Sequence, residues 1–113
     1  MQIFGTKKSK DTRKAERFFK ERRIKYHFVD LKERGLSPRE FDSIKKYVGG
    51  IENMIDWDHR DKDGLAHLKY LVDHQKEEYL LDHPELMKMP IVREKNIAII
   101  GHNEDKWKEL INK

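Results

Sequence analysis

The chain has 113 residues, of which 41% are charged and 36% hydrophobic, and its formal net charge is +4. This length predicts one domain with a small core. No cysteine is present, so disulfides and thiol chemistry are excluded, and a zinc site would need histidine and carboxylate ligands alone. No apolar run approaches the roughly 20 residues of a membrane span. The N-terminal residues show no secretory signal pattern, so we expect a cytoplasmic protein without membrane contact.

The charge is unevenly distributed along the chain. Residues 1–25 contain ten lysines and arginines and three acidic residues, a net charge of +7, whereas the other 88 residues contain 15 and 18, a net charge of −3. Such a basic segment can attract phosphate oxyanions, acidic peptides or nucleic acid. The simpler interpretation is a solvated helix face, because charged stretches of helices usually face water.

The first 30 residues predict a β-α-β unit. Met1–Phe4 is expected to form a short strand, Asp11–Arg23 a helix, and Tyr26–Asp30 a second strand. The helix has apolar residues at i, i+3 and i+4, which places them on one buried stripe: Ala15, Phe18 and Phe19. Because the unit is short, we expect parallel strands joined by a right-handed crossover.

The middle of the chain predicts a block of helices. Ser37–Glu40 is a strong helix start, with a serine cap, a proline in the first turn and a glutamate that completes a capping box. This helix should end at Gly49-Gly50. Residues 51–55 are expected to form another turn and 56–64 a polar loop. Helical spacing then follows at Leu65, Leu68, Leu71 and Val72, and a short helix is expected at Glu77–Asp82, before Pro84.

The C-terminal third predicts a hairpin and a last helix. Met89–Val92 and Ile97–Ile100 are apolar runs that should form antiparallel strands joined by a loop at 93–96. Asn103 should cap a helix that packs Trp107 inward. The order β-α-β, helices, β-β-α predicts a single thioredoxin-like α/β domain over residues 1–113, with residues 36–83 as a helical insertion.

Other groups of polar and aromatic residues were weighed as sites. His67 and His74 could share a helix face near Asp63 and Asp73, and residues 58–61 form another cluster, yet neither has a recognised metal-ligand spacing. We therefore predict surface histidines, with neither metal nor cofactor. Tyr70 and Tyr79 are expected to pack between helices. Direct nucleic-acid binding is not expected, because the aromatic residues are not interleaved with a basic strand face.

Residues 5–15, Gly-Thr-Lys-Lys-Ser-Lys-Asp-Thr-Arg-Lys-Ala, join the first strand to the first helix. They resemble the active-site segment of the arsenate reductase (ArsC)–Spx family, in which a nucleophilic cysteine opens a C-x-x-[STC] pattern followed by basic residues. Ser9 stands at the cysteine position and Thr12 at the last position of the pattern.

A second segment carries the same resemblance. Residues 83–92 are similar to the family's HP-x-L-x-x-RPI-V segment, and Gly101–Asp105 resembles its glycine-led helix start, so the likeness spans essentially the whole chain. The resemblance implies a thioredoxin fold with a helical insertion. It also implies that Pro90 is the proline that is usually cis and faces the nucleophile.

The family's chemistry depends on a thiolate at a helix N-terminus, where backbone amides and basic residues lower its pKa. That thiolate attacks an oxyanion such as arsenate, or a disulfide, with a glutathione-type thiol as partner. The resemblance implies that anions or substrate would be bound by Lys8, Lys10, Arg13, Arg60 and Pro90, beside Ser9 and Thr12. Ser9 cannot supply a thiolate, and a serine nucleophile would need a general base, which no sequence motif supplies.

A further departure lies before the proline. Arsenate reductases of the family carry an arginine there that helps to bind the oxyanion, whereas this chain has Met89. A thioether cannot make the bidentate contact of a guanidinium. Arg93 is also near the proline in sequence, but its side-chain direction is open.

Two functional hypotheses follow from the resemblance. The first is an arsenate reductase-like oxidoreductase that is redox-inactive because residue 9 is serine, whether by natural loss or by an engineered cysteine-to-serine change. In either case Ser9 can also serve simply as a helix cap. The second is an Spx-like regulator that acts by binding a protein, in that branch the RNA polymerase alpha subunit. It is motivated by the basic first helix, although Spx usually carries a Cys-x-x-Cys switch.

Overall fold

A computed structural model describes residues 1–112 of the chain. Four short strands and five α-helices, with two 3-10 turns, follow one another along it. Their order is β1 (Gln2–Gly5), α1 (Lys10–Glu21), β2 (His27–Asp30), α2 (Pro38–Val48), η1 (Ile51–Met54), α3 (Lys62–Lys69), α4 (Asp73–Asp82), η2 (Pro84–Leu86), β3 (Ile91–Glu94), β4 (Ile97–Ile100) and α5 (Glu104–Ile111).

The strands form one mixed sheet in the order β2-β1-β3-β4. β1 pairs with β2 in parallel and β3 pairs with β4 antiparallel, as the sequence predicted. The antiparallel pairing of β1 with β3 joins the two units and was not predicted. Strand β1 lies inside the sheet, and accordingly its Ile3 and Phe4 are fully buried, one on each face. The mixed α/β architecture confirms the predicted fold class.

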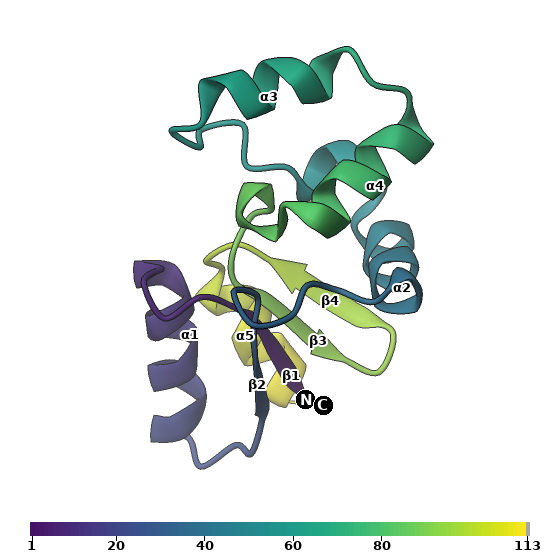
Figure 1. The fold of residues 1–113 in the computed structure, drawn as a ribbon. Helices are drawn as coiled ribbons and strands as arrows, with labels where there is room; N and C mark the ends of the chain where they lie inside the picture. Colours follow the sequence, from purple (N-terminus) through teal and green to yellow (C-terminus); the bar gives the residue numbers. More distant parts are fainter. Residues whose placement is uncertain (113) are drawn as a thin grey trace.

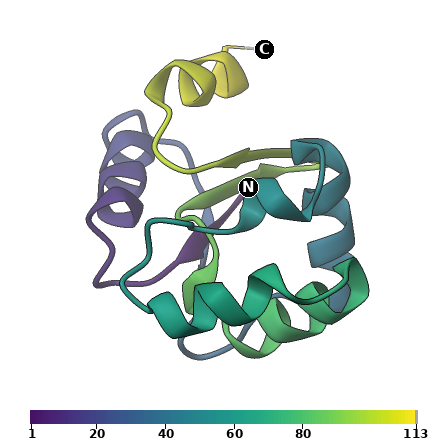
Figure 2. The ribbon, with the colours of Figure 1, turned by 90° about the horizontal axis from the view of Figure 1, so that it is seen from above.

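Helices cover both faces of the sheet. Figures 1 and 2 show α1 and α5 on one side and the helical block α2–α4 on the other. The sequence pattern explains this division, because alternate strand residues face opposite sides. Ile3 and Val92 pack with Phe19 and Trp107 on the α1–α5 side. Phe4, with the buried apolar residues of the other helices, forms the second core.

Helix α3 differs from the sequence prediction at both ends. The expected loop at 56–64 stops at Asp61, whose Oδ1 accepts a hydrogen bond from the Gly64 amide over 3.0 Å and so caps α3. Gly64 lies inside the helix, and a Cβ there would lie 2.6 Å from the Asp61 carboxylate. The helix ends at Lys69, so Leu71 and Val72 do not continue it.

Helix α4 begins four residues before the expected Glu77. The Gln75 side chain accepts the Val72 backbone N–H over 3.2 Å and so stabilises an early start at Asp73. Because α3 and α4 are separate helices, His67 and His74 do not share a helix face, contrary to the prediction. The hairpin is also tighter than expected: β3 runs to Glu94, and only Lys95 and Asn96 form the turn.

None of the helices within residues 1–112 combines the length and the apolar character that a membrane crossing needs.

Candidate anion and substrate cleft

The loop after β1 places Ser9 at the N-cap of α1. The Ser9 Oγ accepts a hydrogen bond from the Thr12 amide over 3.2 Å, and the Ser9 amide itself donates to the carbonyl of Thr6 over 3.1 Å. The serine therefore satisfies one of the four backbone donors that a helix start leaves free. Its side chain is half-buried and borders solvent.

Thr12 takes part in the cap of α1 through its backbone N–H and not through its hydroxyl. Its side chain is fully buried, and its Oγ1 has no hydrogen-bond partner among the described residues. It packs against Gly5, where an added Cβ would lie 2.4 Å from Thr12 Oγ1. Gly5 is thus the only residue type that fits this close approach of strand and helix without a shift. The buried hydroxyl does not line the space beside Ser9.

A cleft of about 680 Å³ opens at the N-terminus of α1. It is bordered by the loop that contains Ser9, by Lys32 after β2, by the loop before α3 and by the segment that leads into β3. The parallel strands β1 and β2 explain part of this arrangement, because their carboxyl ends lie at the same sheet edge. The structure thereby brings Ser9, Lys8 and Arg60 together, as the resemblance implied.

Other predicted site residues lie outside the lining. Lys10 and Arg13 are exposed on α1 and do not line the cleft, while Pro90 is buried beneath it. The Met89–Pro90 peptide bond is cis, as the resemblance implied. Met89 itself lines the cleft, and its Sδ lies 3.8 Å from Thr6 Oγ1. A neutral thioether therefore faces the Ser9 loop.

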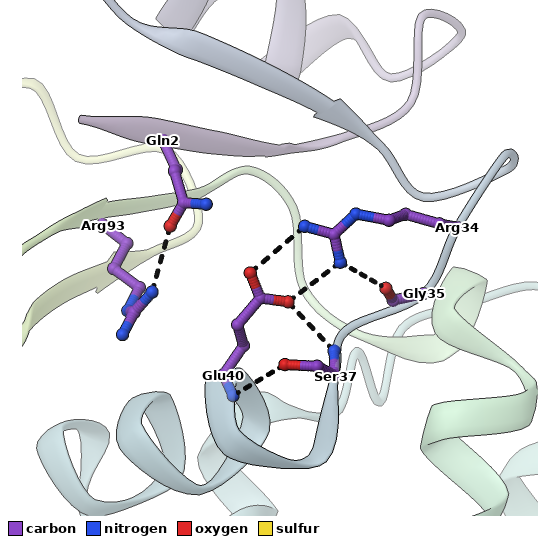
Figure 3. A network of polar contacts seen from close by, with 6 residues as sticks. All are labelled: Gln2, Arg34, Gly35, Ser37, Glu40 and Arg93. Carbon is purple, nitrogen blue, oxygen red and sulfur yellow. Dashed lines mark hydrogen bonds and ion pairs between the residues drawn. The ribbon is translucent and has the colours of Figure 1, made fainter.

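Arg93 does not take over the role of the missing arginine. Its guanidinium donates to Gln2 Oε1 over 3.0 Å and lies 3.5 Å from Ser43 Oγ, on the side of the sheet that α2 covers (Figure 3). This is a structural contact between β1, β3 and α2, and Arg93 is absent from the cleft lining.

The cleft contains both signs of charge. Three cationic side chains line it, and four carboxylates join them: Lys8, Lys32 and Arg60, with Asp11, Asp56, Asp58 and Glu85. A cleft in which carboxylates outnumber cations offers weak overall attraction to a multiply charged oxyanion. Sequence reasoning missed Lys32, Asp56 and Glu85. For Lys32 the available signal was topological, because it follows β2 and the residues after two parallel strands meet at one sheet edge. Asp56 and Glu85 follow neither of these strands.

His59 is the histidine among the candidates for a general base, because it lines the same cleft. Its Nδ1 accepts a hydrogen bond from the Asp61 backbone N–H over 3.0 Å. A neutral imidazole that accepts at Nδ1 carries its proton on Nε2, so Nε2 is a donor and cannot accept a proton from Ser9. Among the described residues, the Ser9 hydroxyl donates no hydrogen bond to a base, whether His59 or one of the cleft carboxylates. His59 is placed to donate to a ligand from Nε2.

The histidines and carboxylates of residues 1–112 do not form a metal site. No cluster of three histidine or carboxylate side chains there is arranged to hold a metal ion. His67, one of the histidines singled out in the sequence, instead packs its ring against Tyr79 with centroids 4.9 Å apart.

Comparison with known proteins identifies the fold. Neither a protein-family model nor a curated protein sequence matches the chain. Solved structures do match over nearly the full length. An ArsC-family related protein from Bacteroides fragilis has a TM-score of 0.83 at 14% identity, with 96% of this chain and 95% of that chain covered.

Two further structures agree with it. An arsenate reductase from Vibrio cholerae has a TM-score of 0.82 at 19% identity, covering 96% of this chain and 97% of its own. A Staphylococcus aureus protein solved by NMR has a TM-score of 0.76 at 24% identity, covering 96% and 95%. The chain therefore has the thioredoxin-like fold of ArsC-related structures. At these identities the likeness establishes the fold and leaves the activity to be argued from the site.

Proposed function

We propose that the chain is an arsenate reductase-like protein of the ArsC/Spx type that keeps the substrate cleft of an oxidoreductase but performs no thiol chemistry. The observation that carries the proposal is the position of Ser9. It caps α1 at the cleft, where the family resemblance places the nucleophilic cysteine, in a chain without any cysteine. In this proposal residues 36–83 are the family's helical insertion.

The groups around Ser9 support binding and disfavour catalysis. The N-terminus of α1 borders the cleft, and the positive end of a helix attracts anions. Lys8 and Arg60 add positive charge, and His59 adds a donor at Nε2. A serine hydroxyl without a base is a poor nucleophile. Met89 and the four carboxylates further disfavour tight binding of a multiply charged oxyanion such as arsenate.

The test of activity uses the pure protein with glutathione and either arsenate or a small disulfide. The expected rate equals that of the protein-free control, because no thiolate is available. Turnover above that control would contradict the proposal. Restoration of turnover by Ser9→Cys would show that the rest of the cleft remains competent, whichever origin the serine has.

The test of binding is a sulfate titration followed by amide NMR shifts. We expect weak, saturable shifts at residues 9–12, and a several-fold weaker affinity in Arg60→Gln, because about one charged contact is lost. Lys20→Gln removes the same charge from an exposed site on α1 away from the cleft, and is expected to leave the affinity unchanged. Absence of shifts at residues 9–12 would remove the anion-binding part of the proposal.

A second candidate function is Spx-like binding of a protein partner. It is supported by the surface of α1 and its flanks, where all ten lysines and arginines of residues 1–25 are exposed. Among the described residues, Lys14 alone of these ten lies within ion-pair distance of a carboxylate, 3.9 Å from Asp11. The test is binding of the purified RNA polymerase alpha subunit to the immobilised chain. Failure to bind, or binding that Arg13→Glu with Arg17→Glu leaves unchanged, would contradict this candidate.

A further inference from the structure

The outer face of α3 carries a groove that the cleft at Ser9 does not explain. The groove has a volume of about 400 Å³ and is lined by Trp57, Leu65, Ala66 and two lysines, Lys62 and Lys69. Figures 1 and 2 show that α3 lies at the periphery of the helical block, away from the α1–α5 side of the sheet. Its buried residues Leu65 and Leu68 anchor it to the core, so the outer face is held on a fixed support.

The floor of the groove is aromatic and partly exposed. Trp57 is half-buried, and the Lys69 ammonium lies 6.0 Å from the centre of its ring, at the outer limit of a cation–π contact. Tyr70, expected from the sequence to pack between helices, is instead 88% exposed at the end of the same helix. Tryptophan and tyrosine are enriched where proteins bind partners, so the half-buried Trp57 and the exposed Tyr70 mark this face as a candidate binding surface. Lysine is not enriched at interfaces, and the two lysines here instead determine which charge a partner must carry.

The positions of two lysines on α3 indicate the charge that a binding partner would carry. Lys62, Ala66 and Lys69 fall at i, i+4 and i+7 and therefore share one helix face. The two lysines are separated by about 10 Å along the axis. Both are exposed, and within residues 1–112 neither forms an ion pair. Ala66 between them is small enough for another backbone to approach closely.

We propose that this groove binds an acidic amphipathic helix of a partner protein. Carboxylates at i and i+7 of that helix pair with Lys62 and Lys69, and apolar side chains at i+3 and i+4 cover Trp57 and Ala66. The proposal does not depend on residue 9 or on the cleft beside it, so its test and that of the proposed function fail independently.

The test uses a synthetic helical peptide with glutamate at i and i+7 and leucine at i+3 and i+4. Trp57 reports binding by its fluorescence, because the other tryptophan, Trp107, is fully buried in the opposite core. We expect a saturable change in emission and amide NMR shifts along residues 62–70. A peptide with glutamine in place of both glutamates should bind about tenfold more weakly. Equal binding of the two peptides would overturn the proposal.

Matched charge reversals separate this groove from the basic surface of α1. Lys62→Glu with Lys69→Glu should weaken the acidic peptide about tenfold or more, since two attractions become repulsions. Lys20→Glu with Lys25→Glu makes the same change in net charge at exposed positions elsewhere and should alter the affinity less than about twofold. Shifts confined to α1, or equal losses in the two variants, would contradict the proposal. Self-association that quenches Trp57 without peptide would assign the groove to a second copy instead.

Discussion

Two helices of this molecule begin with a capping serine, and the surroundings of the two serines differ. At α1 the Ser9 hydroxyl accepts the Thr12 amide over 3.2 Å, and at α2 the Ser37 hydroxyl accepts the Glu40 amide over 3.1 Å. The caps are nearly identical in geometry. The two helices differ in the residue three positions after the serine, and in whether its side chain accepts a hydrogen bond from the backbone at the helix start.

At the start of α2, the backbone is hydrogen-bonded and covered by side chains of the same segment, and we call this a closed helix start. Glu40 accepts the Ser37 backbone N–H over 2.9 Å and takes two further hydrogen bonds from Arg34, over 2.9 and 3.1 Å (Figure 3). The Arg34 guanidinium is the main reason that the pKa of Glu40 falls from 4.5 to about 2. These contacts satisfy backbone donors of the helix start with side chains of the same segment.

The start of α1 is open. Thr12 cannot reach back as Glu40 does, and its hydroxyl is buried against Gly5. The start of α2 is covered by the Glu40 carboxylate. The start of α1 instead borders the cleft that contains Lys8 and Arg60. A capping serine is therefore not evidence of a site by itself. The open surroundings of Ser9 are what favour a binding function there.

The largest effect on stability is expected from adding a side chain at Gly5, where β1 and α1 are in close contact. Gly5→Ala should lower the free energy of unfolding by about 2–3 kcal/mol, because the added methyl meets the buried Thr12 side chain. Adding Thr12→Ala should recover much of the loss, since the atoms at 2.4 and 2.6 Å are removed. Urea denaturation of the parent and of the two variants measures this. A Gly5→Ala protein as stable as the parent would contradict the described packing.

A smaller effect is expected at the closed start of α2. Glu40→Gln keeps a capping side chain but loses the ion pair with Arg34, which should cost about 1–2 kcal/mol at pH 7. Because the folded pKa of Glu40 is depressed, its stabilisation is present above pH 4.5 and is lost as the pH falls towards about 2. Thermal melts across this range should show a flatter acid limb for Glu40→Gln than for the parent.

The control for that variant is Asp42→Asn on the same helix. Asp42 pairs with Lys46 over 3.1 Å. This ion pair is exposed to solvent, because the Lys46 side chain is 76% exposed, whereas the Glu40 side chain is only 14% exposed. We expect a change within about 0.5 kcal/mol. If the acid limbs of Glu40→Gln and Asp42→Asn were the same, the closed start of α2 would not be held by Glu40.

The smallest effect is expected from Thr12→Val. The Oγ1 atom is buried without a partner among the described residues, so an isosteric methyl should change stability by less than about 0.5 kcal/mol. Sulfate affinity at α1 should also stay the same, because the Thr12 side chain is buried and does not line the cleft. A clear loss of sulfate binding would show that the Thr12 hydroxyl contributes to the anion site, contrary to its buried position.

The elements with complete local signals were predicted well from the sequence. Ser37-Pro38 with Glu40 predicted the start of α2, and four short apolar or β-rich runs predicted the strands, with the correct directions of the β1–β2 and β3–β4 pairs. The starts of α3 and α4 were missed because they depend on single side-chain bonds, from Asp61 and Gln75 to backbone amides. The exposure of Tyr70 was missed because α3 ends a residue before it.

Only part of the candidate site could be predicted from the sequence. Ser9, Lys8 and Arg60 were named in advance and line one cleft, and the cis bond before Pro90 is present. The carboxylates that share the cleft come from loops far apart in sequence, so their mixture of charges depends on the folded structure. The direction of Arg93 was likewise set by its partner Gln2 on a neighbouring strand.

The comparison of the two serines is tested most directly by converting each to cysteine. Because the chain has no other cysteine, Ser9→Cys and Ser37→Cys each carry a single thiol. The account predicts that the thiol pKa in Ser9→Cys lies below that of a free cysteine, since the open α1 amides and Lys8 stabilise a thiolate. The Ser37→Cys thiol should have the higher pKa, because the Glu40 carboxylate lies beside it. The pH dependence of their alkylation rates measures both values, and a Ser9→Cys pKa equal to or above that of Ser37→Cys would contradict the account.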